Sequence, residues 1–247
     1  MNEECGWNPN WWLEAKASSL DRKRRSSART ALAKPGDAFL IVTEGTVTEP
    51  VFFDLLLEDL KLPTVRIKVI PGDASDPRRV ISTAGREAEE HVGKAKKNLL
   101  GADQPSKFDH VWAVVDTDVA TRRQFWNEVM QLAATLNVKL AHSTPCFEYC
   151  LLLHKGYTTR TDLVDGDTAK RAVEKELNCK LTDAKSTRRA IVTIIPQWPA
   201  AVHHAGNAST HHRDARTREP ANPSTEVGHL VRALNDSAPE HRRKNLH

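Results

Sequence analysis

Apolar and polar positions alternate with two different periods along the first two thirds of the chain. Short apolar runs such as AFLIVTE (38–44) have the length and composition of buried strands. Segments with apolar residues three or four positions apart, such as Val51 and Leu55, have the period of amphipathic helices. The pattern predicts strands over 38–44, 64–72, 108–118 and 138–143, and helices from Thr46 or Thr48 and over 75–100, 122–136 and 145–154. We therefore predict an α/β fold, with a parallel sheet covered by helices on both faces.

The rest of the chain has a different pattern. After about residue 156 the sequence becomes helical and loop-rich, with the most regular segments at 167–178, 183–195 and 223–235. We predict three parts: a basic, Trp-containing N-terminal arm over 1–36, an α/β core over 37–156 and a helical, loop-rich C-terminal region over 157–247.

Capping signals indicate where three helices should begin. Thr46 and Glu49 have the spacing of a capping box. Asp76 precedes Pro77, which suits a helix that has an aspartate cap and a proline in its first turn. Asn222 could cap the last predicted helix in the same way.

Composition restricts the class of protein. Apolar residues make up 39% of the chain and charged residues 28%, and no apolar run approaches the ~18 residues of a membrane span. The N-terminal sequence lacks the basic start and apolar core of a secretory signal, so we expect a cytoplasmic protein with no membrane partner. Four cysteines without a CxxC pair indicate reduced thiols, and Cys146 and Cys150 are expected in the core.

The net charge of +4 is unevenly distributed along the sequence. One acid-free run contains the basic residues Arg22, Lys23, Arg24, Arg25, Arg29 and Lys34. Such a run suits a flexible arm that contacts phosphates, and it equally suits a solvated arm. A second cluster with the same two interpretations consists of Lys180, Lys185, Arg188 and Arg189.

Three acids follow predicted strands. Glu44 ends the first strand, and Asp116 and Asp118 end the third. The carboxyl ends of parallel strands lie along one sheet edge, where open α/β sheets bind ligands, and alternate residues of an extended chain point the same way. Clustered carboxylates repel one another unless a hard cation such as Mg²⁺ or Mn²⁺ binds them. The alternative is that each acid only caps the helix that follows it.

Four stretches of the sequence occur in the order seen in a known family. They are TEGTVTEPVFF after an apolar strand, VWAVVDTD, PCFEYCLLLH (145–154) and NPST (222–225). The Glu-Gly pair and the later DTD resemble the Toprim domain of topoisomerases, primases, the RNase M5 group and OLD-type nucleases. All four stretches together resemble the RloB-like proteins, and this resemblance spans residues 38–235.

The resemblance implies a Toprim-like, Rossmann-like fold and a Mg²⁺-dependent nuclease that works beside an ABC-type or AAA ATPase in bacterial defence against phage. Glu44 would be the Toprim glutamate, a general acid/base or metal ligand, and Asp116 and Asp118 the metal-holding pair. Many Toprim sequences carry another acid two residues later, where this chain has Ala120. Glu148 is the candidate that would complete the site, although a buried glutamate paired with an arginine is the other interpretation.

The chemistry expected of such a site requires no covalent nucleophile. Negative charge develops on phosphate oxygens during phosphodiester cleavage, and one or two Mg²⁺ ions would stabilise it and lower the pKa of an attacking water. Lys155 and His154 are candidates to contact the scissile phosphate, although His154 equally suits a packed position at a helix end. A topoisomerase is not indicated, because neither Tyr149 nor Tyr157 lies in a separate cleavage domain.

Other classes share parts of this pattern. DTDVA matches the start of haloacid-dehalogenase phosphatases, but that motif belongs on the first strand of its sheet, and a sugar-nucleotide DxD site has no donor-binding region here. The main alternative is a non-catalytic nucleic-acid-binding or regulatory subunit of an ATPase complex. The chain has no GxxxxGK[ST] loop, so ATP hydrolysis would come from a partner, and an oligomer is compatible with the sequence.

A histidine-rich stretch over 203–216 invites a metal assignment. Its four paired histidines lie among Gly, Asn and Ser and lack a His-x₃-His spacing: His203, His204, His211 and His212. We therefore expect a mobile loop there rather than a metal site.

Overall fold

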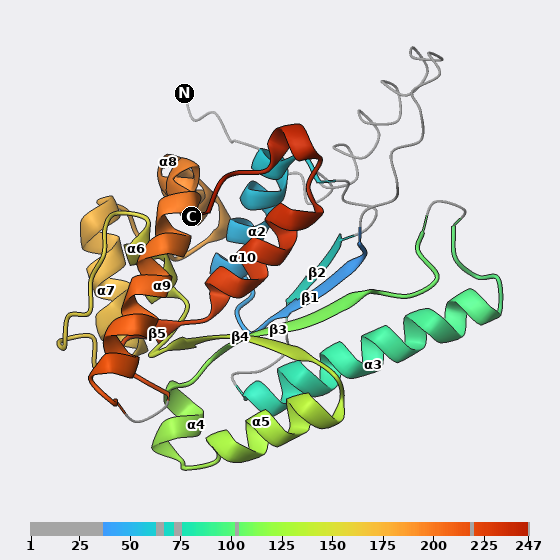
Figure 1. Ribbon diagram of the computed structural model, residues 1–247, viewed down its shortest axis with the longest axis horizontal. Coiled ribbons are helices and arrows are strands. Elements are labelled where there is room, and N and C mark those ends of the chain that lie inside the picture. Colours follow the sequence, from blue (N-terminus) through green and yellow to red (C-terminus); the bar gives the residue numbers. More distant parts are fainter. Residues whose placement is uncertain (1–36, 63–66, 72–75, 102–103, 218–219, 247) are drawn as a thin grey trace, which may run out of the picture. The chain divides into compact units, whose positions relative to one another are not determined.

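A computed structural model describes residues 37–62, 67–71, 76–101, 104–217 and 220–246 (Figure 1). The N-terminal arm predicted over 1–36 lies outside the described residues, and so do the basic residues predicted there to contact phosphates: Arg22, Lys23, Arg24 and Arg25. Among the described residues, no helix has both the length and the apolar character needed to cross a bilayer.

The described strands form one sheet in the order β2-β1-β3-β4-β5. Its strands are β1 (Phe39–Thr43), β2 (Ile67–Pro71), β3 (His110–Asp116), β4 (Lys139–Thr144) and β5 (Ser224–Thr225). The first four are parallel, as the sequence predicted, and β5 pairs antiparallel with β4. This last strand lies inside the predicted helix 223–235, so that helix boundary was wrong.

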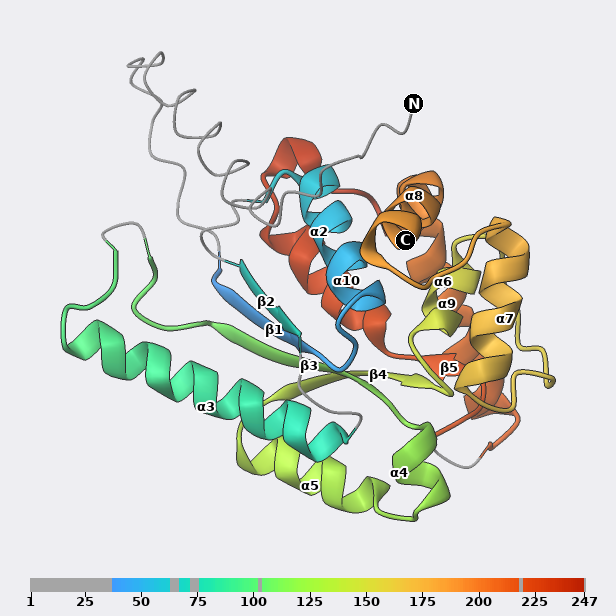
Figure 2. The same ribbon diagram turned by 180° about the vertical axis from the view of Figure 1, so that it is seen from behind.

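Helices cover both faces of the sheet, as predicted (Figures 1 and 2). Side chains of a strand alternate between faces, and in β1 Leu40 and Val42 pack on the side of α3 (Pro77–Lys96) and α5 (Trp126–Thr135). Phe39 and Ile41 pack on the opposite side with α2 (Thr48–Leu60) and the C-terminal helices. Because β1 is buried on both sides, its sequence is a continuous apolar run rather than an alternating one.

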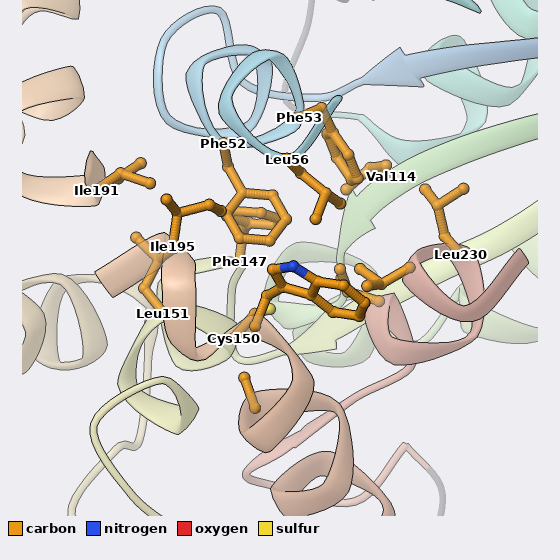
Figure 3. Close-up of a cluster of buried hydrophobic side chains, with 14 of the residues drawn as sticks. Phe52, Phe53, Leu56, Val114, Phe147, Cys150, Leu151, Ile191, Ile195 and Leu230 are labelled. Carbon is orange, nitrogen blue, oxygen red and sulfur yellow. The ribbon is translucent and has the colours of Figure 1, made fainter. Parts of the chain in front are cut away.

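The C-terminal region packs on the α2 side of the sheet (Figure 1). Its elements are α6 (Glu148–Leu153), α7 (Gly166–Leu177), α8 (Ala184–Ile194), η3 (Ile195–Gln197), α9 (Trp198–Asp214), α10 (Val227–Ser237) and η4 (Glu240–Arg242). Figure 3 shows Phe52 of α2 close to Phe147, with Ile191 and Leu230 at opposite sides of the same hydrophobic cluster. The structure therefore has an α/β Toprim-like sheet with a helical C-terminal part packed on it, and the boundary at residue 156 stays a prediction.

The three capping predictions have different outcomes in the structure. Asp76 caps α3, since its Oδ1 accepts from the Arg78 N–H at 2.9 Å, and Pro77 is the first helical residue, as predicted. α2 begins at Thr48, one of the two predicted starts, but the capping box with Thr46 was wrong, because the N-cap is Val47 and the Glu49 carboxylate accepts from the Gly45 N–H. Asn222 caps no helix, because α10 begins only at Val227.

The histidine-rich stretch is helical. Residues 203–214 belong to α9, so the predicted mobile loop was wrong. Ala201, Val202, Ala205 and Ala208 are buried at helical spacing, and this apolar stripe binds the segment to the core. His212 is buried as well and its Nε2 is 2.8 Å from the Pro223 carbonyl oxygen. Packing of one face therefore outweighs the weak helix propensity of the polar residues.

Candidate active site

Glu44 and Asp116 meet at the carboxyl edge of the parallel sheet. β1 and β3 pair as far as Thr43 and Val114, and the Glu44 N–H continues the ladder by donating to the Val114 carbonyl over 2.9 Å. The Glu44 Oε2 accepts a hydrogen bond from the Asp116 N–H at 3.0 Å. The two strand ends are therefore neighbours, as the sequence predicted, and the backbone of one holds the carboxylate of the other.

Asp116 is connected in turn to the segment that contains Glu148. The Asp116 Oδ1 accepts from the Phe147 N–H at 2.8 Å, directly before α6 begins at Glu148. β3 and β4 are held together here by a bond from the Thr117 hydroxyl to the Thr144 hydroxyl at 2.8 Å. Glu148 is half-buried, and its charge acts on Asp116 and on Glu49, so the structure brings it to the same sheet edge.

Glu49 is a fourth carboxyl group of this cluster, and the sequence interpretation missed it. Its side chain is buried, and its Oε1 accepts from the Gly45 N–H at 2.8 Å. A Cβ at position 45 would lie 2.1 Å from the Glu49 Oε2, so only glycine leaves room for this carboxylate. Its position in the TEP part of the first motif was the available signal, but capping-box spacing assigned it a structural role instead.

Asp118 lies beside this cluster on a different element. We predicted that Asp116 and Asp118 share an extended strand, and this was wrong. β3 ends at Asp116, and Asp118 is the first residue of the short helix α4 (Asp118–Arg122). The Asp118 Oδ2 is 3.9 Å from the Arg122 Nη2, and its charge acts on Glu44. A Cβ on Gly166 would be 3.9 Å from the same oxygen, so the start of α7 borders the site.

Burial and mutual repulsion raise the pKa of three of these carboxyl groups. Desolvation is the main cause for Glu44 and raises its pKa to about 7, with the Asp116 N–H opposing and Glu49 and Asp118 adding to the shift. Desolvation and the charge of Glu148 raise the pKa of Glu49 to about 7. The pKa of Asp116 is raised well above its usual range by desolvation, Glu49, Glu44 and Glu148. The cluster therefore holds protons near neutral pH unless a cation replaces them.

The donor set fits a hard divalent cation by its chemistry. Carboxylate oxygens are the ligands that Mg²⁺ prefers, and raised pKa values in one place show unbalanced negative charge that a cation would neutralise. Within the residues that the structure describes, however, no three histidine, cysteine or acidic side chains are placed to hold a metal ion as they stand. The Glu44 and Asp116 oxygens engaged with backbone N–H groups would have to share or exchange those bonds.

Of the residues predicted to bind nucleic acid, the structure describes Lys155, Arg188 and Arg189. Lys155 is exposed just after α6, and Arg189 lies in α8 near Cys179, with its Nη2 3.9 Å from the sulfur. Arg188 pairs with both carboxylate oxygens of Glu58 at 2.8 and 2.9 Å, so its charge is balanced by α2. That Lys155, Arg188 and Arg189 bind nucleic acid stays a prediction.

His154 and two thiols belong to the core. His154 is buried against Phe52, its Nδ1 is 3.0 Å from the Cys150 carbonyl oxygen, and desolvation lowers its pKa to about 4. A neutral buried ring of this kind packs and does not contact a phosphate, so its candidate role is wrong. Cys146 and Cys150 are buried thiols with pKa values raised by desolvation, as expected for core residues.

The sheet order, the covered faces and the acids at the strand ends define an α/β protein of the Toprim-like class. Comparison with known protein families matches residues 39–234 to the family described as RloB-like protein. The match covers more than half of the chain, which therefore belongs to the RloB-like family. No curated protein and no solved structure matches the chain.

Proposed function

We propose that this RloB-like protein is a Mg²⁺- or Mn²⁺-dependent nuclease that hydrolyses phosphodiester bonds of DNA or RNA. The observation that supports the proposal is the group of four carboxyl groups with a shortage of cations at the carboxyl edge of the sheet: Glu44, Glu49, Asp116 and Glu148. A divalent cation held by Glu44, Asp116, Glu148 and the neighbouring Asp118 would stabilise negative charge on the phosphate.

The side chains themselves would move protons and position the substrate. If Glu44 acts as the base rather than as a ligand of the cation, its pKa of about 7 would let it accept a proton from an attacking water at neutral pH and later return it. Gly45 has no side chain, which keeps the backbone beside Glu44 accessible and leaves the Glu49 carboxylate in place. Glu49 adds negative charge close to Glu44, which keeps Glu44 basic enough for this role.

An ATPase partner is part of the proposal. The sequence contains no phosphate loop of the GxxxxGK[ST] type, so any ATP-driven step has to be supplied by another protein, for which the family resemblance suggests an ABC or AAA ATPase. The same resemblance suggests antiviral defence as the setting in which the pair would act.

A second candidate function is a non-catalytic, nucleic-acid-binding or regulatory subunit of such an ATPase complex. It is favoured by the hydrogen bonds that tie the Glu44, Glu49 and Asp116 carboxylates to backbone N–H groups, which would suit a structural role. It is also favoured by the lack of a ready-made three-ligand metal site among the described residues.

One experiment separates the two candidates. The purified chain is incubated with labelled DNA and RNA in Mg²⁺, Mn²⁺ or EDTA, alone and together with the ATPase partner. A nuclease cleaves with metal and not with EDTA, and Asp116→Asn, which preserves an acceptor for the Phe147 N–H, removes the cleavage. A non-catalytic subunit binds without cleavage under every condition, and cleavage that persists in Asp116→Asn would exclude this cluster as its site.

A further inference from the structure

The C-terminal half of α7 and part of α8 border an open basic cleft of about 480 Å³. We call it the α7–α8 cleft, and its charged lining consists of Arg171, Lys175, Lys180, Arg189 and Glu174. Glu174 is neutralised locally, since its Oε2 is 2.6 Å from the Lys180 Nζ and its Oε1 accepts from the Leu181 N–H at 3.1 Å. The single acid of the cleft is therefore already satisfied.

The three remaining cations are in excess. Arg171, Lys175 and Arg189 are exposed, and the described part of the chain places no carboxylate in an ion pair with any of them. Lys175 could serve only to stabilise the carboxyl end of α7, where a cation is favourable. That explanation does not reach Arg189, which lies on another helix, or Arg171, which lies in the middle of α7. An open cleft with surplus positive charge from two helices points to a polyanion.

The position of α7 relates this cleft to the carboxylate cluster. The helix begins at Gly166, where a Cβ would lie 3.9 Å from the Asp118 Oδ2, and residues of its second half line the cleft. Hydrogen bonds from Thr168 lower the pKa of Asp165, and Arg171 and Arg122 lower it further, so positive charge is present at the start of the helix as well. Arg171 and Lys175 are four residues apart and so lie on the same side of α7. Arg171 and Arg122 therefore place positive charge beside the ionised Asp165 at the start of α7, and Arg171 and Lys175 contribute positive charge to the cleft.

The length of this path suits a nucleic-acid strand. Twelve residues of helix span about 18 Å, and a strand of B-form DNA carries one phosphate per 3.4 Å of its axis, so about five phosphates would fit beside α7. A mononucleotide in the cleft would be too short to reach the carboxylate cluster. We propose that the α7–α8 cleft binds the phosphate backbone of a nucleic-acid strand that extends along α7 from the carboxylate cluster. This inference rests on the proposed function, because it assigns a binding path to the same substrate.

The other basic groove of the described chain is a weaker candidate. It lies along α3, has a volume of about 300 Å³ and contains Arg78, Arg79 and Arg86. The guanidinium of Arg78 is paired with Asp76 at 2.9 Å and with Glu128 at 3.1 Å, and it lies 4.1 Å from the centre of the Phe125 ring. Arg78 is therefore balanced within the fold, and Arg86 lies 3.9 Å from Glu90, so Arg79 alone of these three has no ion pair among the described residues, whereas three cations of the α7–α8 cleft have none.

Salt-dependent binding of the full-length protein to a labelled 20-nucleotide single strand tests the proposal. DNA and RNA versions are titrated in EDTA, where cleavage is suppressed, over a range of KCl concentrations. The triple variant Arg171→Gln/Lys175→Gln/Arg189→Gln should bind at least tenfold more weakly at low salt. It should also flatten the slope of log K against log salt by about two units, since each single-strand phosphate contact contributes about 0.7.

A matched control removes the same number of charges far from the cleft. Lys94→Gln/Lys96→Gln/Lys97→Gln changes the carboxyl end of α3, about 30 Å along that helix from its start at the active-site edge, and should change the slope by less than half a unit. Equal slopes for the two triple variants, or a cleft variant that binds like the wild type, would overturn the proposal. Thermal melting of both variants verifies that they fold, and the single reversal Lys175→Glu repeats the test with the smallest perturbation.

Two further outcomes have defined meanings. If AMP binds with a cleft-dependent affinity while the oligonucleotide slope is unchanged, the cleft is a nucleotide pocket and the strand proposal is wrong. If the cleft variant flattens the slope while wild-type protein cleaves nothing in Mg²⁺ or Mn²⁺, the strand proposal stands and the proposed hydrolysis fails. The reverse result is that the wild type cleaves in a metal-dependent way while the cleft variant binds the strand as the wild type does. That result overturns only the strand proposal.

Discussion

Glu44 is the residue on which the proposed chemistry depends. Its carboxylate accepts from the Asp116 N–H, and desolvation together with Glu49 and Asp118 raises its pKa to about 7. Glu44 meets two requirements of a general base, a fixed position and a pKa near neutrality, and potential metal ligands lie next to it. If Glu44 only capped the helix that follows it, none of these features would be needed.

Replacing Glu44 by glutamine tests this role directly. The amide oxygen of the new side chain could still accept from the Asp116 N–H, so the fold should be preserved, but an amide has neither the charge nor the basicity of a carboxylate. We expect Glu44→Gln to bind nucleic acid like the wild type and to lose cleavage by a factor on the order of 10² or more. Cleavage rates under single-turnover conditions measure this, and a wild-type rate would remove Glu44 from the mechanism.

Glu49 should act differently, through its charge on its neighbours. Glu49→Gln keeps an oxygen that can accept from the Gly45 N–H and removes a negative charge that helps to raise the pKa values of Asp116 and Glu44. Both pKa values should fall, so the acidic limb of the pH–rate profile should move to lower pH. The pH dependence of cleavage, compared with wild type, measures the shift, and an unchanged profile would show that Glu49 is only structural.

At the scale of elements, the turn between β1 and α2 determines how the carboxylates converge. The Thr43 hydroxyl donates to the Gly45 carbonyl at 2.9 Å, and the Gly45 N–H binds Glu49. The turn thus replaces the predicted capping box by a bond from the helix back to the strand end. The same bond places the first turn of α2, with Glu49, next to the sheet edge that carries Glu44.

Gly45→Ala should disrupt this turn. The new Cβ would lie 2.1 Å from the buried Glu49 carboxylate, which would have to leave the Gly45 N–H. Loss of a buried hydrogen bond of this kind costs about 1–3 kcal/mol, and cleavage should fall because the cluster is rearranged. Gly93→Ala is the matched control, since a Cβ there meets nothing within 4 Å in the interior of α3, and it should stabilise by about 0.5–1 kcal/mol. Urea unfolding of both variants decides whether position 45 has the special constraint.

Sequence periodicity was sufficient for the four parallel strands and for Asp76 as a helix cap, because burial on both faces and local capping leave direct patterns. It failed where distant contacts decide the structure. The strand β5 exists only because Ser224 and Thr225 pair with β4, where the Thr225 hydroxyl lies 2.7 Å from the Ser143 hydroxyl. Glu49 was missed for the same reason, since its burial and its like-charged neighbours arise from the assembled sheet edge.

At the scale of the whole molecule, the carboxylate cluster couples stability to pH. The ordinary pKa of Glu44 and Glu49 is 4.5, and in the folded protein it is raised to about 7. Below pH 4.5 both folded and unfolded chains hold these protons, and no stability is lost. As pH rises through 7 the folded protein must release them into a buried, repulsive site, so their contribution to stability is lost. His154 has the opposite sign, because its pKa is lowered to about 4 and its contribution falls away in acid.

We therefore expect the free energy of unfolding in EDTA to decrease between pH 5.5 and pH 8, relative to the double variant Glu44→Gln/Glu49→Gln, by an amount on the order of 3 kcal/mol. The variant retains His154, so the difference between the two proteins isolates the contribution of the two carboxyl groups.

Mg²⁺ at ten times its Kd should restore about 1.4 kcal/mol to the free energy of unfolding of the wild type at pH 8. The effect should be smaller at pH 5.5, where protons compete for the same oxygens. Urea unfolding at the two pH values, with EDTA or Mg²⁺, measures all of these terms. Equal pH dependence in the two proteins, or a Mg²⁺ effect of the same size in the variant, would show that this cluster neither holds protons near neutrality nor binds the cation.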